Sequence, residues 1–145
     1  MTFELIALLC TAFFASACVY VSFVEQPARL ACSTDAAIAE WRTSFKRAAM
    51  MQIGLVVIGA LAAVAAVVAG QGPLVLLGGL LLVLMFPYTL IVIMPVNRLL
   101  LDTTRPVDAT TDALLRKWGR LHHGRTVGSL AALAILTIDI LLRIA

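Results

Sequence analysis

Charged residues are scarce in this chain, and their scarcity excludes an ordinary soluble fold. Of its 145 residues only 13% are Asp, Glu, Lys or Arg, whereas 62% are hydrophobic. A soluble domain has about a quarter charged and about half apolar residues, so it has no place for this much apolar surface. The composition therefore predicts an integral membrane protein.

Cysteine and histidine are also rare, and their spacing disfavours thiol and metal chemistry. Cys10, Cys18 and Cys32 form no Cys-x-x-Cys pair, which disfavours a thiol–disulfide relay. The two histidines, His122 and His123, are adjacent, so on a helix they point about 100° apart and make poor joint ligands. We expect no metal site, because too few carboxylates are available nearby to complete a di-iron centre.

A positively charged N-terminal region is missing as well. Residues 1–9 contain Glu4 and no Lys or Arg, although Ala15-Ser16-Ala17 looks like a signal cleavage site. Secretory signals begin with a positive region, so we interpret this apolar segment as a membrane helix and not as a signal peptide.

Long apolar runs are what the sequence does contain. A helix needs about 20 apolar residues to cross the hydrocarbon core, and four runs meet this requirement. The second and third are joined only by residues 70–73, which forces a helical hairpin. We predict an all-α fold, a polytopic membrane four-helix bundle that forms one domain over residues 1–145, with an extra cytoplasmic amphipathic helix segment before the last span. The predicted spans are residues 3–24, 48–69, 74–94 and 127–142.

The basic residues indicate how the chain lies in the membrane. Of eleven Lys and Arg, four lie between the first two spans, six lie between the last two, and only Arg143 lies elsewhere, four residues after Asp139 in a spacing that predicts an ion pair. By the positive-inside rule the two long charged loops are cytoplasmic and both termini are outside. We expect an inner membrane of bacterial type. Because topology accounts for the net charge of +3, no nucleic-acid partner is expected.

Two features within the spans bear on packing. Ala62, Ala66 and Gly70 recur every four residues and predict close helix contact, either inside the bundle, which we favour, or at the seam of a homo-oligomer. Pro87 removes one backbone hydrogen bond from the third span and predicts a kink, which can open a cavity.

Polar side chains suited to chemistry gather at the cytoplasmic ends of the spans. Each has a simpler explanation, such as helix capping, snorkelling or an interfacial amphipathic helix with a basic face for anionic lipid. Their coincidence at four neighbouring helix ends favours a cavity, since ionisable residues near membrane depth usually face a bundle interior. Such a cavity suits a lipophilic small molecule with a polar edge. The candidates are Glu25, Arg29, Arg47, Asn97, Arg98, His122 and Arg125, with Trp118 as a roof and Tyr88 deeper inside.

The segment before the last span has a helical pattern. Its spacing places Trp118, His122 and Arg125 on one side of a helix together with Leu115. A helix there needs an N-cap, and four residues offer one: Asp108, Thr110, Thr111 and Asp112.

The end of the first span allows two conformations. Glu25 lies four residues before Arg29, so the two can pair on one face if the helix persists through Pro27. Pro27 can instead end the helix, because a residue before proline disfavours helix. The sequence leaves both open, and it also leaves open whether Glu25 pairs with Arg29 or with His122.

Three motifs resemble those of a known family. They are VEQPAR at Val24–Arg29, MPVNRLL at Met94–Leu100 and LLRKWGRLHHGR at Leu114–Arg125. With Arg47 at the start of the second span, their order and helix spacing resemble the anthrone oxygenase-like family of small four-helix integral membrane proteins, a domain-of-unknown-function family. The similarity spans nearly the whole chain.

The resemblance implies oxidation of a lipophilic aromatic, anthrone-like substrate by O₂ at the cytoplasmic face, without a known metal or flavin. In that reaction His122 would be the base that removes an acidic proton. Arg29 and Arg125 would stabilise the resulting anion, Asn97 would orient it, and Glu25 would hold His122 or Arg29. We expect no cofactor, with O₂ as co-substrate. The other candidates, Arg47, Arg98, Trp118 and Tyr88, would help to bind the substrate.

Two classes of function stay open at this point. The first is a cofactor-independent membrane oxidoreductase, and the second is a non-enzymatic module, meaning a small carrier, a lipid-binding protein or an accessory subunit. A carrier needs a polar path across the midplane, and mid-span polar residues such as Thr11, Ser16 and Thr89 are few and mild. Either class predicts lipophilic small molecules and membrane lipids as partners.

Overall fold

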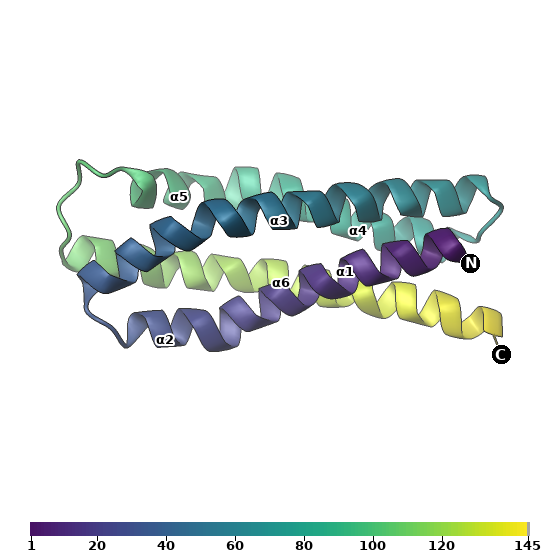
Figure 1. Ribbon diagram of the computed structural model, residues 1–145, viewed down its shortest axis with the longest axis horizontal. Coiled ribbons are helices and arrows are strands. Elements are labelled where there is room, and N and C mark those ends of the chain that lie inside the picture. Colours follow the sequence, from purple (N-terminus) through teal and green to yellow (C-terminus); the bar gives the residue numbers. More distant parts are fainter. Residues whose placement is uncertain (145) are drawn as a thin grey trace.

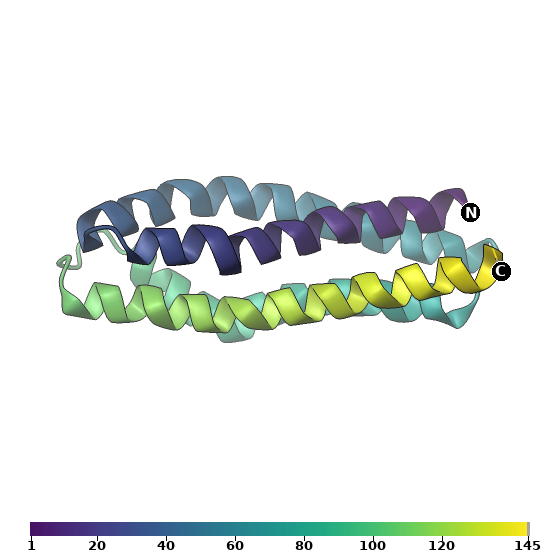
Figure 2. The ribbon, with the colours of Figure 1, turned by 90° about the horizontal axis from the view of Figure 1, so that it is seen from below.

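The chain folds into four long helical rods that lie side by side along one axis (Figure 1, Figure 2). The computed structural model describes residues 1–144. Two of the rods are unbroken helices, and two are α-helices interrupted by a short π-helical segment. The elements are α1 (Thr2–Tyr20), η1 (Val21–Glu25), α2 (Gln26–Leu30), α3 (Thr34–Val68), α4 (Pro73–Tyr88), η2 (Thr89–Ile93), α5 (Met94–Leu101) and α6 (Ala109–Ile144).

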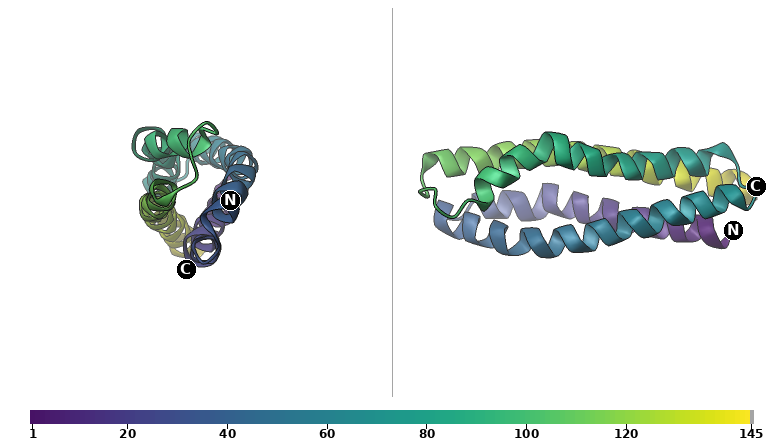
Figure 3. Two further views of the ribbon diagram at one scale, coloured as in Figure 1. Left: turned by 90° about the vertical axis from the view of Figure 1, so that its left-hand side faces the viewer. Right: turned by 90° about the horizontal axis from the view of Figure 1, so that it is seen from above.

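The rods occupy the corners of a four-sided bundle (Figure 3, left). Both α1 and α4 pack against α3 and α6, so α1 and α4 lie at diagonally opposite corners. One end of the bundle, here called the terminal end, holds Met1, the end of α6 and the α3–α4 turn (Figure 1). The opposite end, called the loop end, holds the α2–α3 turn and the α5–α6 loop.

Four helices are long and apolar enough to cross a membrane, and the chain is an integral membrane protein of the predicted all-helical class. The helices continue well past the predicted spans at the loop end, because α3 begins at Thr34 and α6 at Ala109. The amphipathic segment expected before the last span is therefore not a separate element. It forms part of α6, which runs unbroken from Ala109 to Ile144.

Local side-chain chemistry sets where the long helices begin. Of the four residues that could cap α6, Asp108 does so, because its carboxylate accepts hydrogen bonds from the backbone N–H of Thr110 at 2.8 Å and of Thr111 at 3.2 Å. Ser33 caps α3 in the same way, accepting from the N–H of Ala36. These bonds satisfy N–H groups that have no partner inside the helix.

The turn between α3 and α4 is a Schellman motif. Gly70 has φ of +86°, and its N–H donates to the carbonyl of Val67, while the N–H of Gln71 donates to the carbonyl of Ala66. Pro73 then begins α4, where its missing N–H leaves no bond unmade. This turn produces the helical hairpin expected from the short connection.

Small residues close the terminal half of the bundle. A Cβ added at Gly79 would stand 2.6 Å from the Cβ of Ala63, and one at Gly78 would stand 2.6 Å from Leu136. Ala62 and Ala66 of the predicted stripe pack inside the bundle, whereas Gly70 is exposed in the α3–α4 turn. The two alanines belong to a core cluster formed by residues of α1, α3, α4 and α6: Ala7, Ala62, Ala63, Ala66, Val75 and Leu136. The helices approach closely here and leave no large cavity among these residues.

Both π-helical segments end two residues before a proline, η1 before Pro27 and η2 before Pro95. Proline lacks an N–H, and its ring crowds the carbonyl four residues earlier. The wider i→i+5 bonding of a π-helix accommodates that carbonyl without breaking the helix. The helix therefore persists through Pro27, and in the third rod α4 continues through Pro87 and gives way to η2 two residues later.

An ion-pair cluster fastens the terminal end. Arg143 pairs with Asp139 on the same helix at 3.0 Å, as the spacing predicts, and with the buried Glu4 of α1 at 3.3 Å. Its guanidinium also donates to the side-chain carbonyl of Gln71 in the α3–α4 turn. One side chain thus links the first rod, the hairpin turn and the last rod.

Two glycine substitutions test the turn. Gly70→Ala meets no atom within 4 Å, so its only penalty is the left-handed backbone, and we expect a loss of about 1–2 kcal/mol in the free energy of unfolding. Gly54→Ala, in the middle of α3 and equally free of contacts, should instead stabilise by up to about 1 kcal/mol through helix propensity. Unfolding in detergent followed by circular dichroism measures both. Equal effects of the two substitutions would contradict the Schellman assignment.

Candidate functional site

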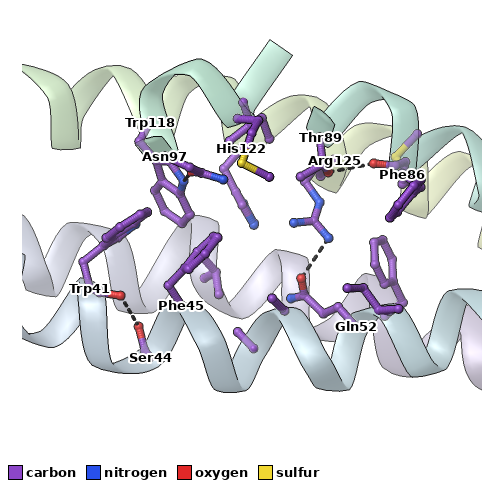
Figure 4. A pocket seen from close by; sticks show the side chains of 18 of the residues that line it. Trp41, Ser44, Phe45, Gln52, Phe86, Thr89, Asn97, Trp118, His122 and Arg125 are labelled. Atoms are coloured by element: carbon purple, nitrogen blue, oxygen red, sulfur yellow. Dashed lines mark hydrogen bonds between the residues drawn. The ribbon is translucent and has the colours of Figure 1, made fainter. Parts of the chain in front are cut away.

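A cavity with a volume of about 150 Å³ lies between the middle of the bundle and the loop end. All four rods contribute to its wall, and η1 and η2 both border it. An apolar cavity of this volume is large enough to hold an aromatic ring such as benzene. Figure 4 shows the side chains that surround it.

Most of the wall is apolar and aromatic. Trp41 and Phe45 of α3 stack with ring centroids 4.9 Å apart, and Trp41 meets Trp118 of α6 edge to face at 5.7 Å. Such walls suit a flat hydrophobic ligand. The other apolar residues of the wall are Phe14, Val21, Ala48, Ala49, Ile53, Val56, Met85, Phe86, Leu90, Ile93 and Met94.

His122 lies on the wall at the centre of the cavity and is buried (Figure 4). Its ring lies 5.0 Å from that of Trp118, and its Nδ1 is 3.2 Å from the hydroxyl of Ser22 in η1. The Ser22 hydroxyl is in turn 2.7 Å from that of Thr126, which donates to the backbone carbonyl of Cys18.

The direction of these hydrogen bonds follows from the carbonyl at their end. A carbonyl only accepts, so the Thr126 hydroxyl donates to it and accepts from Ser22. The single Ser22 proton is then used, and the Ser22 oxygen accepts from His122 Nδ1–H. This chain fixes the neutral tautomer in which Nε2 carries a lone pair and is the ring nitrogen left for the cavity.

Arg29 is held by its neighbours. Each of its three nitrogens has a side-chain partner: Nε donates to Glu40, one terminal nitrogen to Gln26 at 2.5 Å, and the other to Glu25. Glu25 therefore pairs with Arg29 and not with His122. The guanidinium also lies 5.7 Å from the ring centre of Trp118. These contacts join α2, α3 and α6 at the loop end and leave Arg29 in a mainly structural position.

Arg125 has fewer side-chain hydrogen-bond partners than Arg29. Its guanidinium donates to the Gln52 side chain at 2.8 Å and lies 5.1 Å from the ring centre of Phe14 (Figure 4). Its Nε is buried and has no hydrogen-bond partner, and within residues 1–144 it forms no ion pair with a carboxylate. A buried cation without a counter-ion is costly, so this cavity favours an anionic group beside Arg125.

Two further polar groups line the loop-end wall. Asn97 accepts a hydrogen bond from Trp118 Nε1 at 2.9 Å, which leaves its amide N–H groups for a ligand. The Nε1 of Trp41 is buried without any partner. The cavity thus has unsatisfied donors near both ends, Trp41 toward the loop end and Arg125 toward the middle of the bundle.

The structure brings together six of the nine residues that the sequence singled out and separates three. Arg47 lies on a shallow outer groove of α3, and Arg98 is exposed at the surface of α5. Tyr88 faces α6, where its hydroxyl donates to the carbonyl of Leu121 at 2.8 Å. These three do not line the cavity. Those that do are Glu25, Arg29, Asn97, Trp118, His122 and Arg125.

Sequence reasoning missed several polar residues of the site: Ser22, Gln26, Glu40, Gln52 and Thr126. The sequence could have indicated Gln52, because an amide inside an otherwise apolar span needs a hydrogen-bond partner. Ser22 and Thr126 gave none, since single hydroxyls often bond to their own helix backbone.

Within residues 1–144 no cluster of three or more His, Cys, Asp or Glu side chains could hold a metal ion. The fold and the cavity define an integral membrane four-helix protein with an internal aromatic site that contains a histidine and an unpaired arginine. The sequence model of the anthrone oxygenase family matches residues 41–135, well over half of the chain. The protein therefore belongs to the anthrone oxygenase family. No curated protein and no solved structure matches it significantly.

The Arg29 cluster predicts a difference between two arginines. Arg29→Met leaves two carboxylates and an amide without their shared partner, and we expect it to lower the free energy of unfolding by about 2–3 kcal/mol. Arg116→Met removes only an exposed pair with Asp112 and should change it by less than about 0.5 kcal/mol. Thermal unfolding in detergent compares them. A tolerated Arg29→Met would show that the cluster does not hold the loop end together.

Proposed function

We propose that this protein oxidises a lipophilic, hydroxylated anthrone to the corresponding anthraquinone with O₂, using its own side chains without a metal or flavin. The observation that supports this most is that His122, hydrogen-bonded through Nδ1 to Ser22, and Arg125, whose Nε has no partner, border the same apolar cavity. A base next to a fixed cation favours formation of an aromatic anion. The family match agrees with this chemistry.

The reaction consumes one O₂ and releases one water. His122 Nε2 takes a proton from the ring methylene, and the electron pair left on carbon adds to O₂ to give a peroxide. The proton returns to the outer peroxide oxygen. Loss of the second methylene hydrogen then breaks the O–O bond and expels water, leaving a carbonyl. The methylene carbon is oxidised, and both oxygen atoms of O₂ are reduced.

The anion formed in the first step is where the protein contributes most. Its negative charge spreads to the ring oxygens, and Arg125 Nε and Trp41 Nε1 are buried donors without a partner at the two ends of the cavity. Pre-positioned donors in an environment of low dielectric constant stabilise a developing charge without reorganisation. Asn97 offers an N–H to orient the substrate. Arg29 positions the wall, because its own partners already engage it.

The same proposal includes a membrane orientation. Ten of the eleven basic residues lie in residues 29–47 and 98–125, the two stretches that contain the turns at the loop end of the bundle. The positive-inside rule would place the loop end and its cavity toward the cytoplasm of an inner membrane, with both termini outside. A lipophilic polyphenol and the surrounding lipids are then the expected partners.

The base assignment is tested on the two neighbouring histidines. His122→Ala should fold normally and lower the rate constant for quinone formation by about 10²–10⁴, because the proton acceptor is lost. His123→Ala is the matched control, since His123 is exposed and stacks on Phe23 outside the cavity. The assay follows quinone absorbance and O₂ uptake with a hydroxylated anthrone in proteoliposomes, corrected for the spontaneous rate in protein-free liposomes. Full activity of His122→Ala would exclude this base.

The anion site is tested on two arginines. Arg125→Met removes the unpaired cation and should weaken binding of a hydroxyanthraquinone product at least tenfold, about 1.4 kcal/mol. Arg98→Met removes an exposed charge that does not line the cavity and should leave binding unchanged. Quenching of the intrinsic fluorescence measures both. Tight binding by the wild-type protein without turnover would instead favour a carrier or accessory role.

A further inference from the structure

Three residues of the cavity wall are also exposed on the outside of the bundle. Ile53 is 49% exposed, Phe86 47% and Leu90 45%, whereas the rest of the wall is buried or half-buried. A side chain that borders a cavity and also reaches the outer surface marks an opening. All three lie on one seam of the bundle, between α3 and the α4–η2 rod.

That seam is closed at both ends and open between them. Toward the terminal end, Gly79 of α4 lies against Ala63 of α3. At the loop end, Arg42 of α3 donates to the backbone carbonyls of Leu100 at 2.7 Å and Asp102 at 2.8 Å. Between these points α3 packs on α4 and α5 but makes no close backbone approach to η2.

The surface around this opening is apolar. Val57 on α3, Leu84 on α4 and Ile91 on η2 belong to the same two rods, do not border the cavity and are at least half exposed. Each belongs to a helix long and apolar enough to cross the membrane. Such a surface faces lipid chains and not water.

The loop end gives a poorer route. There Trp41 and Trp118 meet edge to face, and Arg29 is clamped by carboxylates of α3 and the first rod. A ligand coming from the water would have to displace both contacts. The opening beside η2 requires only apolar side chains to move.

We propose that the cavity takes its ligand from the lipid phase, through the opening formed by Ile53, Phe86 and Leu90. The mouth is apolar, and the polar groups His122, Asn97 and Arg125 lie on α5 and α6, with Gln52 of α3 and Thr89 of η2 also on the wall. The site therefore selects a flat molecule that partitions into the membrane and carries oxygen atoms on its leading edge. The identity of that ligand as the anthrone substrate rests on the proposed function, whereas the route does not.

A covalent plug tests the route. In a Cys32→Ser background, Leu90→Cys or Ile91→Cys is labelled in detergent with a bulky alkyl maleimide and reconstituted into phosphatidylcholine vesicles. Ile91 is the matched control, because it adjoins Leu90, is 73% exposed and does not border the cavity. Cys10 and Cys18 are buried, and mass spectrometry selects singly labelled protein.

The fluorescence of the protein's own tryptophans reports ligand entry, so no added probe is needed. The chain's only two tryptophans, Trp41 and Trp118, both line the cavity, so stopped-flow quenching by a dihydroxyanthraquinone follows entry without requiring turnover. We expect the plug at position 90 to slow quenching about tenfold or more, and the plug at position 91 to leave it unchanged. A second measurement needs no label: Phe86→Ala should speed quenching several-fold, and Leu84→Ala, exposed but outside the cavity wall, should not.

The outcomes separate the route from the function. Equal rates for the two plugs, with wild-type turnover intact, would overturn the lateral route and leave the oxygenase proposal standing. Slower quenching with the plug at position 90, in a protein that shows no turnover, would support the route and overturn the oxygenase proposal. Absence of quenching in the unlabelled protein would overturn both.

Discussion

A polypeptide in hydrocarbon must satisfy its backbone hydrogen bonds within itself, and the rest of this structure depends on how the chain meets that constraint while enclosing a cavity. Breaking a helix would expose unpaired N–H and C=O groups to lipid. This chain widens two helices instead, at η1 and η2, and the cavity lies between the widened segments. The terminal half has close glycine and alanine contacts and no such segment. One half of the bundle therefore fixes the helices, and the other half holds the site.

The two arginines of the cavity wall, Arg29 and Arg125, differ in their surroundings and therefore in their roles. Arg29 lies where three helices converge and meets two carboxylates, so its charge is compensated and it stabilises the fold. Arg125 lies deeper, meets an amide and an aromatic face, and keeps its charge uncompensated. Under the proposed function, the free energy that the protein forgoes by leaving Arg125 unpaired is available for binding an anion. In that proposal Arg29 serves stability and Arg125 serves binding.

The sequence predicted the fold well because its strongest signals are local. Apolar runs set the four helices, and 3.6-residue periodicity correctly aligned Leu115, Trp118 and His122 on the buried side of α6. Spacing also offered the pair between Glu25 and Arg29 as one of two alternatives, and the structure shows this pair. These inferences need only the spacing along one helix.

The site was predictable only in part, because its geometry depends on helix phase and on contacts between helices. A π-helical turn contains an extra residue and rotates all later side chains by about 100° relative to an unbroken α-helix. Arg98 lies beyond η2, where a helical wheel drawn for the span fails, and it points outward. Arg47 is on the outer side of α3, and nothing in its surroundings along the chain says so. The hydrogen bond of His122 to Ser22 joins residues 100 positions apart, and no local pattern contains it.

The cluster around Arg143 has a consequence for how the protein is made. The buried carboxylate of Glu4 belongs to the first membrane helix and has two cationic partners, the N-terminal ammonium of Met1 at 2.6 Å and Arg143 of the last helix at 3.3 Å. During synthesis the first helix enters the bilayer before Arg143 exists, so until the fourth helix arrives the cation beside Glu4 is the N-terminal ammonium. The same arginine then contacts the turn of the middle hairpin. Closure of the terminal end is therefore completed by the last helix to be synthesised, which adds a second cation beside Glu4 and contacts the hairpin turn.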